Sequence, residues 1–344
     1  MRQLLFFLLM LDMNKLEALN KVKSYGENLS ELPVEFKKDI DVVKVAVKKD
    51  GYFIKYAHKD LRKNFEIVYS AIKATSIPEI LKFIDKKFLK NKLIILTAVK
   101  QRGGALKYAD KTLKKNKEIV LAAVKEEKKN KFHSKGKALK YADKTLKKNK
   151  DIVLAAVKHD GFSLKYADKI LKKNKKIVLT AINEHGGSIE YADKTLKKNK
   201  DICLAAIKRF GGSISYMHKS IKNDKNIALY AIKCGATLLD IVNNLQKNKQ
   251  FILDVVTQEY NSWQLMHAYH FKKNKEVVLA AVNNFGVSLE YAHTSLKKDK
   301  EIVLAAVKND GWSIEFASKQ LRNDPEIIKY ALKENPSVKK LLGR

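Results

Sequence analysis

The chain has 344 residues and a formal net charge of +33, from 70 Lys and Arg against 37 Asp and Glu. An apolar fraction of 45% is ordinary for a globular protein, so the charge excess does not indicate disorder. The two Cys exclude a disulfide scaffold and most zinc-ribbon folds, and no apolar run reaches the ~18–20 residues that a membrane-spanning helix needs.

The sequence repeats itself about every 25 residues, and the string YADKTLKKNK occurs at 108, 141 and 191. Such self-similarity is typical of solenoids, whose repeats share one hydrophobic core by stacking. The one large irregularity is an insertion within EEKKNKFHSKGK, residues 126–137, which we expect to be a surface loop. Extending the register predicts twelve repeats, marked by Glu31, Tyr56, Phe83, Tyr108, Tyr141, Tyr166, Tyr191, Tyr216, Asp240, Met266, Tyr291 and Phe316.

Residues 1–25 begin with an apolar stretch, LLFFLLML at 4–11, that resembles the core of a signal peptide. However, Asp12 follows at once without a small-residue cleavage site, and Asn14 lies one repeat length before Asp39. We therefore interpret 1–25 as a degenerate repeat or cap. A signal-like segment and a misassigned start at Met13 stay open as alternatives.

Each repeat is expected to contain two helices. In the repeat around Tyr166, the apolar residues from Leu164 to Leu171 fall on one side of a helical wheel and the Lys residues on the other, which predicts an amphipathic first helix. A serine precedes the first apolar residue and suits an N-cap. It is found as Ser163, Ser188, Ser213, Ser288 and Ser313.

The second helix is predicted to start at an Asn or Asp that caps its first turn and to end near a recurrent Gly. A buried strand, as in a leucine-rich horseshoe, is less favoured because Ala-Ala pairs are poor in strands. The capping positions are Asp39, Asn64, Asn91, Asn116, Asn149, Asn174, Asn199, Asp224, Asn248, Asn274, Asp299 and Asp324. Because this helix is apolar nearly all round, its neighbours must cover it on several sides. The predicted fold is an all-α solenoid of about twelve 25-residue helix–turn–helix repeats over residues 26–334, followed by a tail, 335–344.

The pattern IVLAAVKxDGxSLxYAxKxLKxD, which residues 302–324 follow closely, resembles the short bacterial and viral repeat called domain of unknown function 4116. The likeness extends from residue 26 to about 334 and is weakest at 233–271. This family has no established catalytic residues. The resemblance therefore implies an architecture and an interaction role, and no active site.

The KKNK motif places lysines at the same corner of successive repeats, which predicts a basic ridge along one edge. The ridge is defined by Lys114, Lys115, Lys147, Lys148, Lys172, Lys173, Lys197, Lys198, Lys297 and Lys298. Only six basic residues are Arg, so specific base recognition is disfavoured and nonspecific polyanion binding is the hypothesis. Helix-dipole compensation, ion pairs within a helix and the composition of an AT-rich genome compete with it.

The divergent repeats offer a second candidate surface, a partner-binding patch made of Asp240, Trp263, Met266, His267 and His270. The two histidines are three residues apart on one predicted helix, but no nearby Cys or carboxylate supports a metal site. No phosphate-binding loop, metalloprotease or nucleophile motif occurs, and we expect no catalytic residue, cofactor or metal. Cys203 and Cys234 are predicted to be buried free thiols.

The sequence thus favours a non-enzymatic repeat scaffold for protein–protein interaction. The alternative is nonspecific binding of nucleic acid or an anionic surface through the lysine ridge. We expect a monomer with another protein as its partner, no transmembrane span, and an intracellular location, cytoplasmic or in a host cell if the protein is viral or an effector.

Overall fold

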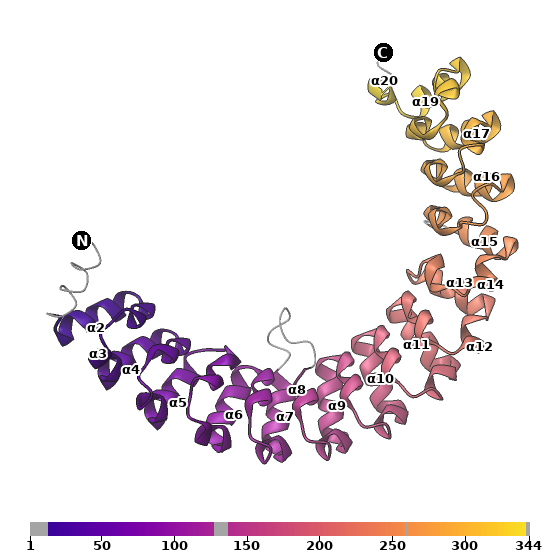
Figure 1. Cartoon of the computed structure of the whole chain (residues 1–344). Helices are drawn as coiled ribbons and strands as arrows, with labels where there is room; N and C mark the ends of the chain where they lie inside the picture. Colours follow the sequence, from indigo (N-terminus) through magenta and orange to yellow (C-terminus); the bar gives the residue numbers. More distant parts are fainter. Residues whose placement is uncertain (1–12, 127–136, 259–260, 342–344) are drawn as a thin grey trace. The chain divides into compact units, whose positions relative to one another are not determined.

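A computed structural model describes residues 13–126, 137–258 and 261–341 (Figure 1). Within these ranges the backbone forms helices and turns and no strand, which confirms the predicted all-α repeat solenoid. The chain divides into two compact units, Met1–Glu184 and His185–Arg344, which are described separately. That residues 26–334 form one continuous body stays a prediction, and most of the predicted loop at 126–137 lies outside the described residues.

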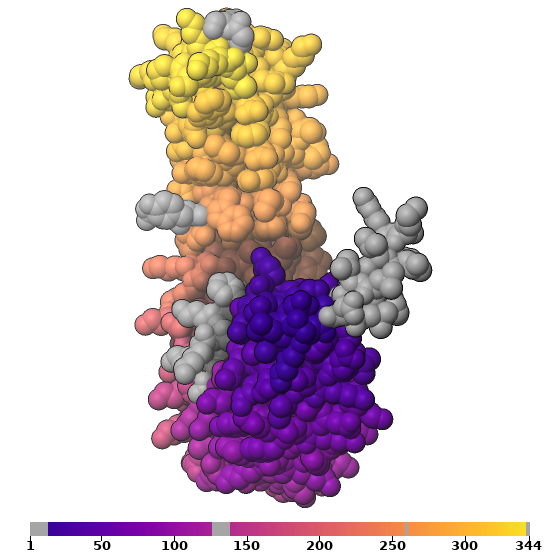
Figure 2. Space-filling model, turned by 90° about the vertical axis from the view of Figure 1, so that its left-hand side faces the viewer, coloured from indigo at the N-terminus to yellow at the C-terminus, as the bar shows by residue number. Residues whose placement is uncertain are grey.

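Each repeat ends in an α-helix of eight to ten residues, called the long helix below. In Met1–Glu184 the long helices are α2 (Lys15–Ser24), α4 (Ile40–Lys49), α5 (Phe65–Lys73), α6 (Lys92–Gln101), α7 (Lys117–Glu126), α9 (Lys150–His159) and α10 (Lys175–Glu184). In His185–Arg344 they are α11 (Lys200–Arg209), α13 (Lys225–Lys233), α15 (Lys249–Val256), α16 (Lys275–Asn284), α17 (Lys300–Asn309) and α19 (Pro325–Glu334). Within each unit, successive long helices pack side by side, and Figure 2 shows the repeats of His185–Arg344 as contiguous layers.

The segment before each long helix is not the single amphipathic α-helix that the sequence predicted. It forms two short helical turns, mostly 3-10. The first turns are η1 (Gly26–Ser30), η2 (Gly51–Tyr56), η4 (Pro78–Lys82), η6 (Gly103–Tyr108), α8 (Lys137–Tyr141), η10 (Gly161–Tyr166), η12 (Gly186–Tyr191), η14 (Gly211–Tyr216), η15 (Leu238–Asp240), η16 (Ser262–His267), η17 (Gly286–Tyr291) and η19 (Gly311–Phe316). The second turns are α3 (Val34–Lys38), η3 (Leu61–Lys63), η5 (Lys86–Lys90), η7 (Leu113–Lys115), η9 (Leu146–Lys148), η11 (Leu171–Lys173), η13 (Leu196–Lys198), α12 (Lys219–Lys222), α14 (Asn243–Gln246), η18 (Leu296–Lys298) and α18 (Lys319–Arg322).

The break between the two turns has a physical cause, seen clearly at Asp168. Its side chain accepts a hydrogen bond from the Ile170 amide at 3.0 Å, and Ala167 before it is extended, with φ −65° and ψ 152°. Its own amide donates to the carbonyl oxygen of Lys147 in the preceding repeat at 3.0 Å. A continuous helix would have used that amide internally, so the bond between repeats replaces a bond within the helix.

The same bond between repeats recurs at the equivalent position elsewhere. Its donors and acceptors are His58 to Lys37, Asp85 to Arg62, Asp110 to Leu89, Asp143 to Lys114, His218 to Lys197, His293 to Lys272 and Ser318 to Lys297. His218 and His293 also take over the side-chain role of Asp at this position. In each, Nδ1 accepts a hydrogen bond from the backbone amide two residues later, at 3.2 Å. These side chains therefore act as turn caps.

The predicted Asn and Asp caps of the long helices are confirmed at all of the positions named above, where a side-chain oxygen accepts from the second or third amide of the helix. The serine caps were wrong. Asp160 caps η10 by accepting from the Phe162 amide at 3.0 Å, whereas Ser163 lies inside the turn and is fully buried. The serine was misplaced because the turn begins three residues earlier than the apolar pattern suggested.

Except at Gly235, which follows α13, the recurrent Gly does not serve as a left-handed helix cap either. Among the described glycines only Gly235 has a positive φ, of 89°. Several others open the next turn where it approaches the following long helix: a Cβ at Gly51 would lie 1.7 Å from the Ala71 carbonyl oxygen, and one at Gly311 would lie 2.5 Å from that of Ala331. Close approach of two backbones, and not backbone conformation, is what selects Gly here.

The two ends of the described chain each carry a helix. α2 follows Asn14, whose side chain forms a capping box with Glu17, while residues 1–12 lie outside the described residues. At the other end α20 (Val338–Leu341) packs against α19 and η19 and buries Val338 completely. The C-terminal segment thus covers part of the last long helix.

Candidate interaction surface

The long helices bury two of their faces and leave a third partly open. In α17, Ile302, Val303, Ala306 and Val307 are fully buried, whereas the adjacent Leu304 and Ala305 are only half-buried. Glu301 and Lys308 are exposed at the two ends of that open face. The spacing of these residues, i, i+3, i+4 and i+7, places an acid, two apolar side chains and a lysine in line on one side of the helix.

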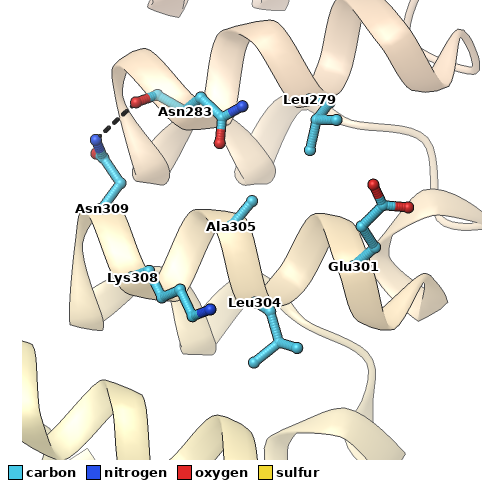
Figure 3. A pocket seen from close by; sticks show the side chains of 7 residues that line it. All are labelled: Leu279, Asn283, Glu301, Leu304, Ala305, Lys308 and Asn309. Carbon is cyan, nitrogen blue, oxygen red and sulfur yellow. Dashed lines mark hydrogen bonds between the residues drawn. The ribbon is translucent and has the colours of Figure 1, made fainter.

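The open face recurs along the array and forms a groove where two long helices meet. Between α16 and α17 the groove has a volume of ≈ 590 Å³. Figure 3 shows its walls, which are formed by Leu279, Asn283, Glu301, Leu304, Ala305, Lys308 and Asn309. One end is closed by Asn309, whose Nδ2 donates to the Asn283 carbonyl oxygen at 2.9 Å. The groove is therefore apolar in the middle and polar at its ends.

Ion pairs neutralise the edge of this face at the N-terminal ends of the long helices. Lys275 lies 2.7 Å from Asp299 and 2.7 Å from Glu301, and Lys300 lies 3.0 Å from Asp324. The hydrogen bond from Lys275 lowers the pKa of Asp299, against the opposing effect of partial burial. Equivalent pairs between neighbouring repeats are Lys15 with Asp39 and Asp41, Lys92 with Glu118, Lys117 with Asp151, Lys200 with Asp224 and Lys249 with Glu276.

The opposite edge carries lysines without carboxylate partners. A lysine lies nine residues after the capping Asn or Asp of most long helices, in the last turn, and it is exposed in each case. This C-terminal lysine row consists of Lys23, Lys48, Lys73, Lys100, Lys125 and Lys158 in Met1–Glu184, and of Lys208, Lys233, Lys308 and Lys333 in His185–Arg344. Lys308 lies over the Tyr330 ring, 4.5 Å from its centroid. Within the described ranges none of these lysines forms an ion pair.

Sequence reasoning missed this row because the KKNK motif is more conspicuous. The signal was present in the single lysine of the AAVK segment, since counting nine residues from each cap finds it. The row fails at Asn183, Thr257 and Asn283, which occupy the equivalent positions of α10, α15 and α16.

The lysine ridge predicted from KKNK separates into two chemically different sets. The first lysine of each pair is half-buried and donates from Nζ to the backbone carbonyl oxygen seven residues earlier. The distances are 2.8 Å for Lys114, 2.7 Å for Lys147, 2.8 Å for Lys172, 2.6 Å for Lys197 and 2.7 Å for Lys297. Burial lowers the pKa of Lys114, Lys147, Lys197 and Lys297. These side chains stabilise the first turn of their own repeat.

The second lysine of each pair is exposed, and this set comprises Lys115, Lys148, Lys173, Lys198 and Lys298. No hydrogen bond or ion pair holds these five side chains in the part of the chain that the structure describes. The ridge therefore retains about half of the side chains that the sequence assigned to it. Polyanion binding through the remaining five stays a prediction.

The patch predicted in the divergent repeats is only partly assembled. Trp263 and His267 lie edge to face, with ring centroids 5.9 Å apart, and both are half-buried, while His270 is exposed. Asp240 accepts hydrogen bonds from the amide and hydroxyl of Thr237, at 2.9 and 3.0 Å, and so serves as a turn cap. Whether these residues contact a partner stays a prediction.

The register assigned to Met266 was wrong by one residue. η16 and η17 align Ser262 with Gly286 and Ala268 with Ala292, which places His267 at the position of Tyr291. Relative to the repeat of η17, two extra residues precede η16 and one fewer follows it, so counting back from the next cap gave a register one residue off.

Polar side chains that were not singled out join the divergent repeats. Gln264 is fully buried; its Oε1 accepts from the Leu238 amide and its Nε2 donates to the Ala236 carbonyl oxygen, both at 3.0 Å. Asn284 donates from Nδ2 to Ser262 Oγ at 2.6 Å. These bonds connect neighbouring repeats through side chains.

Among the described residues, the cysteines form no disulfide and no cluster of side chains could hold a metal ion. Both cysteines are free; Cys203 is buried, which raises its pKa to about 12, whereas Cys234 is only half-buried and was predicted wrongly to be buried. Among the residues described, no three His, Cys, Asp or Glu side chains are grouped to hold a metal ion, and no helix is long and apolar enough to cross a membrane.

The repeats match one family model, described as a domain of unknown function (DUF4116), in ten overlapping segments. These are residues 16–62, 45–89, 64–113, 91–147, 130–172, 174–222, 199–239, 248–297, 274–322 and 299–338. No curated protein and no solved structure matches the chain. Because the matched segments cover most of the sequence, the chain belongs to the DUF4116 family of short helical repeats.

Proposed function

We propose that this protein is a non-enzymatic repeat scaffold that binds another protein along the open face of its long helices. One observation carries the proposal: in each unit, Leu and Ala at the fifth and sixth positions of several long helices stay half-buried, while their neighbours on the same helices are fully buried. Examples are Leu121 and Ala122, Leu154 and Ala155, Leu204 and Ala205, and Leu304 and Ala305. Apolar side chains of this kind, rimmed by polar groups, are typical of a protein interaction surface.

Repeat architecture supports this role, because stacked helices present the same side chains at regular intervals over an extended surface. The groove between α16 and α17 gives the surface depth as well as length. Where an apolar side chain can enter such a groove, its burial would stabilise a complex by about 25 cal/mol per Å².

Selection of peptides from a displayed random library tests the proposal without a known partner. The target is the full chain, and its matched variant carries Leu279→Glu and Leu304→Glu on the open face. The control carries Leu239→Glu and Ile170→Glu, because these two side chains are 57% and 70% exposed and lie off that face. We expect the selected peptides to bind the wild type and the control equally, and the face variant at least about tenfold more weakly. Peptides that bind all three proteins alike, or a library that yields no binder, would refute the proposal.

The second candidate, nonspecific polyanion binding, is supported by the five exposed ridge lysines. Retention on heparin across a salt series tests it. Replacement of Lys115, Lys148, Lys173, Lys198 and Lys298 with Gln should lower the salt concentration of elution, because each lysine that neutralises a sulfate of heparin adds to the salt dependence of binding. If this variant elutes with an equal-charge control variant, the ridge has no special role.

A further inference from the structure

We propose, resting on the proposed function, that the open face of Met1–Glu184 binds an extended acidic segment of a partner protein. The segment's carboxylates would contact the C-terminal lysine row, and its apolar side chains would contact the leucines beside that row. The part of the face that carries this proposal comprises α5, α6, α7 and α9, which are consecutive long helices in contact with one another (Figure 1).

The charge distribution across this face is asymmetric. At its N-terminal edge Lys92 lies 2.6 Å from Glu118 and Lys117 lies 3.4 Å from Asp151, so these two cations are paired with carboxylates. At its C-terminal edge Lys73, Lys100, Lys125 and Lys158 are exposed and form no ion pair within the described residues. Lysines without carboxylate partners therefore recur on every helix along the C-terminal edge, and the complementary ligand is an anion that follows that edge.

An apolar row lies directly beside these lysines. Leu96, Leu121 and Leu154 stand four residues before Lys100, Lys125 and Lys158 on the same helices, which places each leucine one turn away from its lysine on the same side. All three leucines are half-buried. A ligand on this face would meet an apolar side chain and a cation on every helix that it crosses.

The repeat spacing fits an extended polypeptide. Packed helices lie about 8–10 Å apart, and an extended chain advances about 3.3–3.6 Å per residue, so about three ligand residues cross each long helix. A carboxylate at every third position would then meet each lysine of the row in turn. This register identifies the ligand as an extended acidic segment with apolar residues between its acids.

An acidic polypeptide fits this face better than a nucleic acid does. Nucleic-acid surfaces favour Arg, which binds phosphate with two hydrogen bonds, and aromatic side chains on which bases stack. At the four positions of the row, all the cations are Lys, and three of the four neighbouring side chains are Leu; the fourth is Tyr69, over which Lys73 already lies at 5.6 Å. Leucine contributes to burial of apolar side chains and not to base stacking.

The test uses the full chain and fluorescent 15-residue peptides in anisotropy titrations. One peptide has Glu at every third position with Leu and Ser between, a second has the same composition with its Glu residues clustered, and a third has Gln in place of Glu. We expect the periodic Glu peptide to bind at least about tenfold more tightly than the other two, and its affinity to fall with added salt.

Two matched variants locate the binding. The row variant replaces Lys73, Lys100, Lys125 and Lys158 with Gln. The control replaces Lys59, Lys86, Lys111 and Lys144, which are exposed, lie in the same unit and change the net charge equally. The row variant should lose about tenfold in affinity for the periodic peptide and the control less than about twofold, because only the row lysines are expected to pair with the carboxylates of the peptide.

Equal losses in the two variants would overturn the inference, as would binding of a random single-stranded RNA of equal charge as tight as that of the periodic peptide. If the acidic peptides fail but library peptides still require Leu279 and Leu304, only this inference fails. If the library also yields no face-dependent binder, the proposed function fails with it.

Discussion

The regular repeat that contains η17 and α17 and the divergent repeats around η15 and η16 solve the same packing problem with different chemistry. In the regular repeat, Gly286 lies so close to α17 that a Cβ would approach the Ala306 carbonyl oxygen to 2.3 Å, and the Ser288 hydroxyl is buried without a partner. In the divergent repeat Ser262 and Gln264 occupy these two positions and form hydrogen bonds. The comparison shows that backbone proximity and buried side-chain bonds are alternative ways to join repeats.

The largest expected loss of stability follows from placing a side chain where two backbones lie close together. Gly51→Val should destabilise the protein by more than about 3 kcal/mol, because its Cβ would lie 1.7 Å from the Ala71 carbonyl oxygen and neither backbone can move aside. Gly104→Val is the control, since no atom lies within 4 Å of a Cβ there. Chemical denaturation followed by circular dichroism would measure both. Equal stability of the two variants would show that the close approach is not what selects Gly51.

Removing the buried hydrogen bonds of Gln264 tests the divergent repeats in the same way. Gln264→Leu should cost about 2 kcal/mol, because it leaves the Leu238 amide and the Ala236 carbonyl oxygen buried without their partner. Ser288→Ala at the equivalent position should be neutral or slightly stabilising, since that hydroxyl has no partner to lose. Hydrogen exchange of the Leu238 amide would report the local effect. A harmless Gln264→Leu would mean that the divergent repeats are joined by apolar packing alone.

Acid should weaken the bonds between the regular repeats. The pKa of Asp299 is lowered in the folded protein, chiefly by Lys275, so its contribution to stability is full above the ordinary carboxyl value of about 3.9 and is lost as pH falls through the lower folded value. Asp299→Asn keeps the helix cap but removes this titration. The loss of stability at neutral pH should be below about 1 kcal/mol, because the Lys275 side chain is half exposed and solvent screens the pair.

Melting temperatures between pH 6 and pH 2.5 would show this effect. The difference between wild type and Asp299→Asn should shrink as pH falls below about 4. A difference that stays constant with pH would show that Lys275 and Asp299 do not interact in solution.

The smallest expected effect concerns the two thiols, one in a regular repeat and one at the start of the divergent region. Because burial raises the pKa of Cys203 to about 12, it should resist a thiol reagent at pH 8 in the folded state, whereas half-buried Cys234 should react. Mass spectrometry after brief labelling would assign the modified residue. Rapid labelling of Cys203 in the Cys234→Ser variant would reveal local opening of α11.

Features that depend on neighbours in sequence could be predicted from the sequence, and those that depend on neighbours in space could not. The cap at Asn149 is recognised because its side chain bonds to Asp151 and Ile152 within the same turn. The break at Asp168 was missed because its amide bonds to Lys147, in a different repeat. The apolar periodicity predicted one continuous helix. The Lys147 carbonyl oxygen, which accepts the Asp168 amide, divides that segment into two turns.

Contacts with residues distant in sequence also limited the prediction of the candidate surface. A lysine pattern predicts a basic edge, but it does not reveal that Lys197 donates to the Glu190 carbonyl oxygen or that Lys200 pairs with Asp224. The first contact removes Lys197 from the predicted ridge, and the second neutralises a lysine close to it in sequence. The C-terminal lysine row was predictable in principle, because its distance from each cap is constant.

The bonds between repeats also bear on how such a chain can change its length. Within each unit the amide that opens the second turn finds its acceptor in the repeat before, as Asp143 does with Lys114 and His293 does with Lys272. Every repeat thus supplies a donor amide at one boundary and an acceptor carbonyl oxygen at the other. Both are backbone groups, so the bond does not depend on which side chains are present. Duplication or deletion of a whole repeat leaves a donor amide facing an acceptor carbonyl oxygen at the new boundary. Gene rearrangement can therefore lengthen or shorten the array without new side chains in its core.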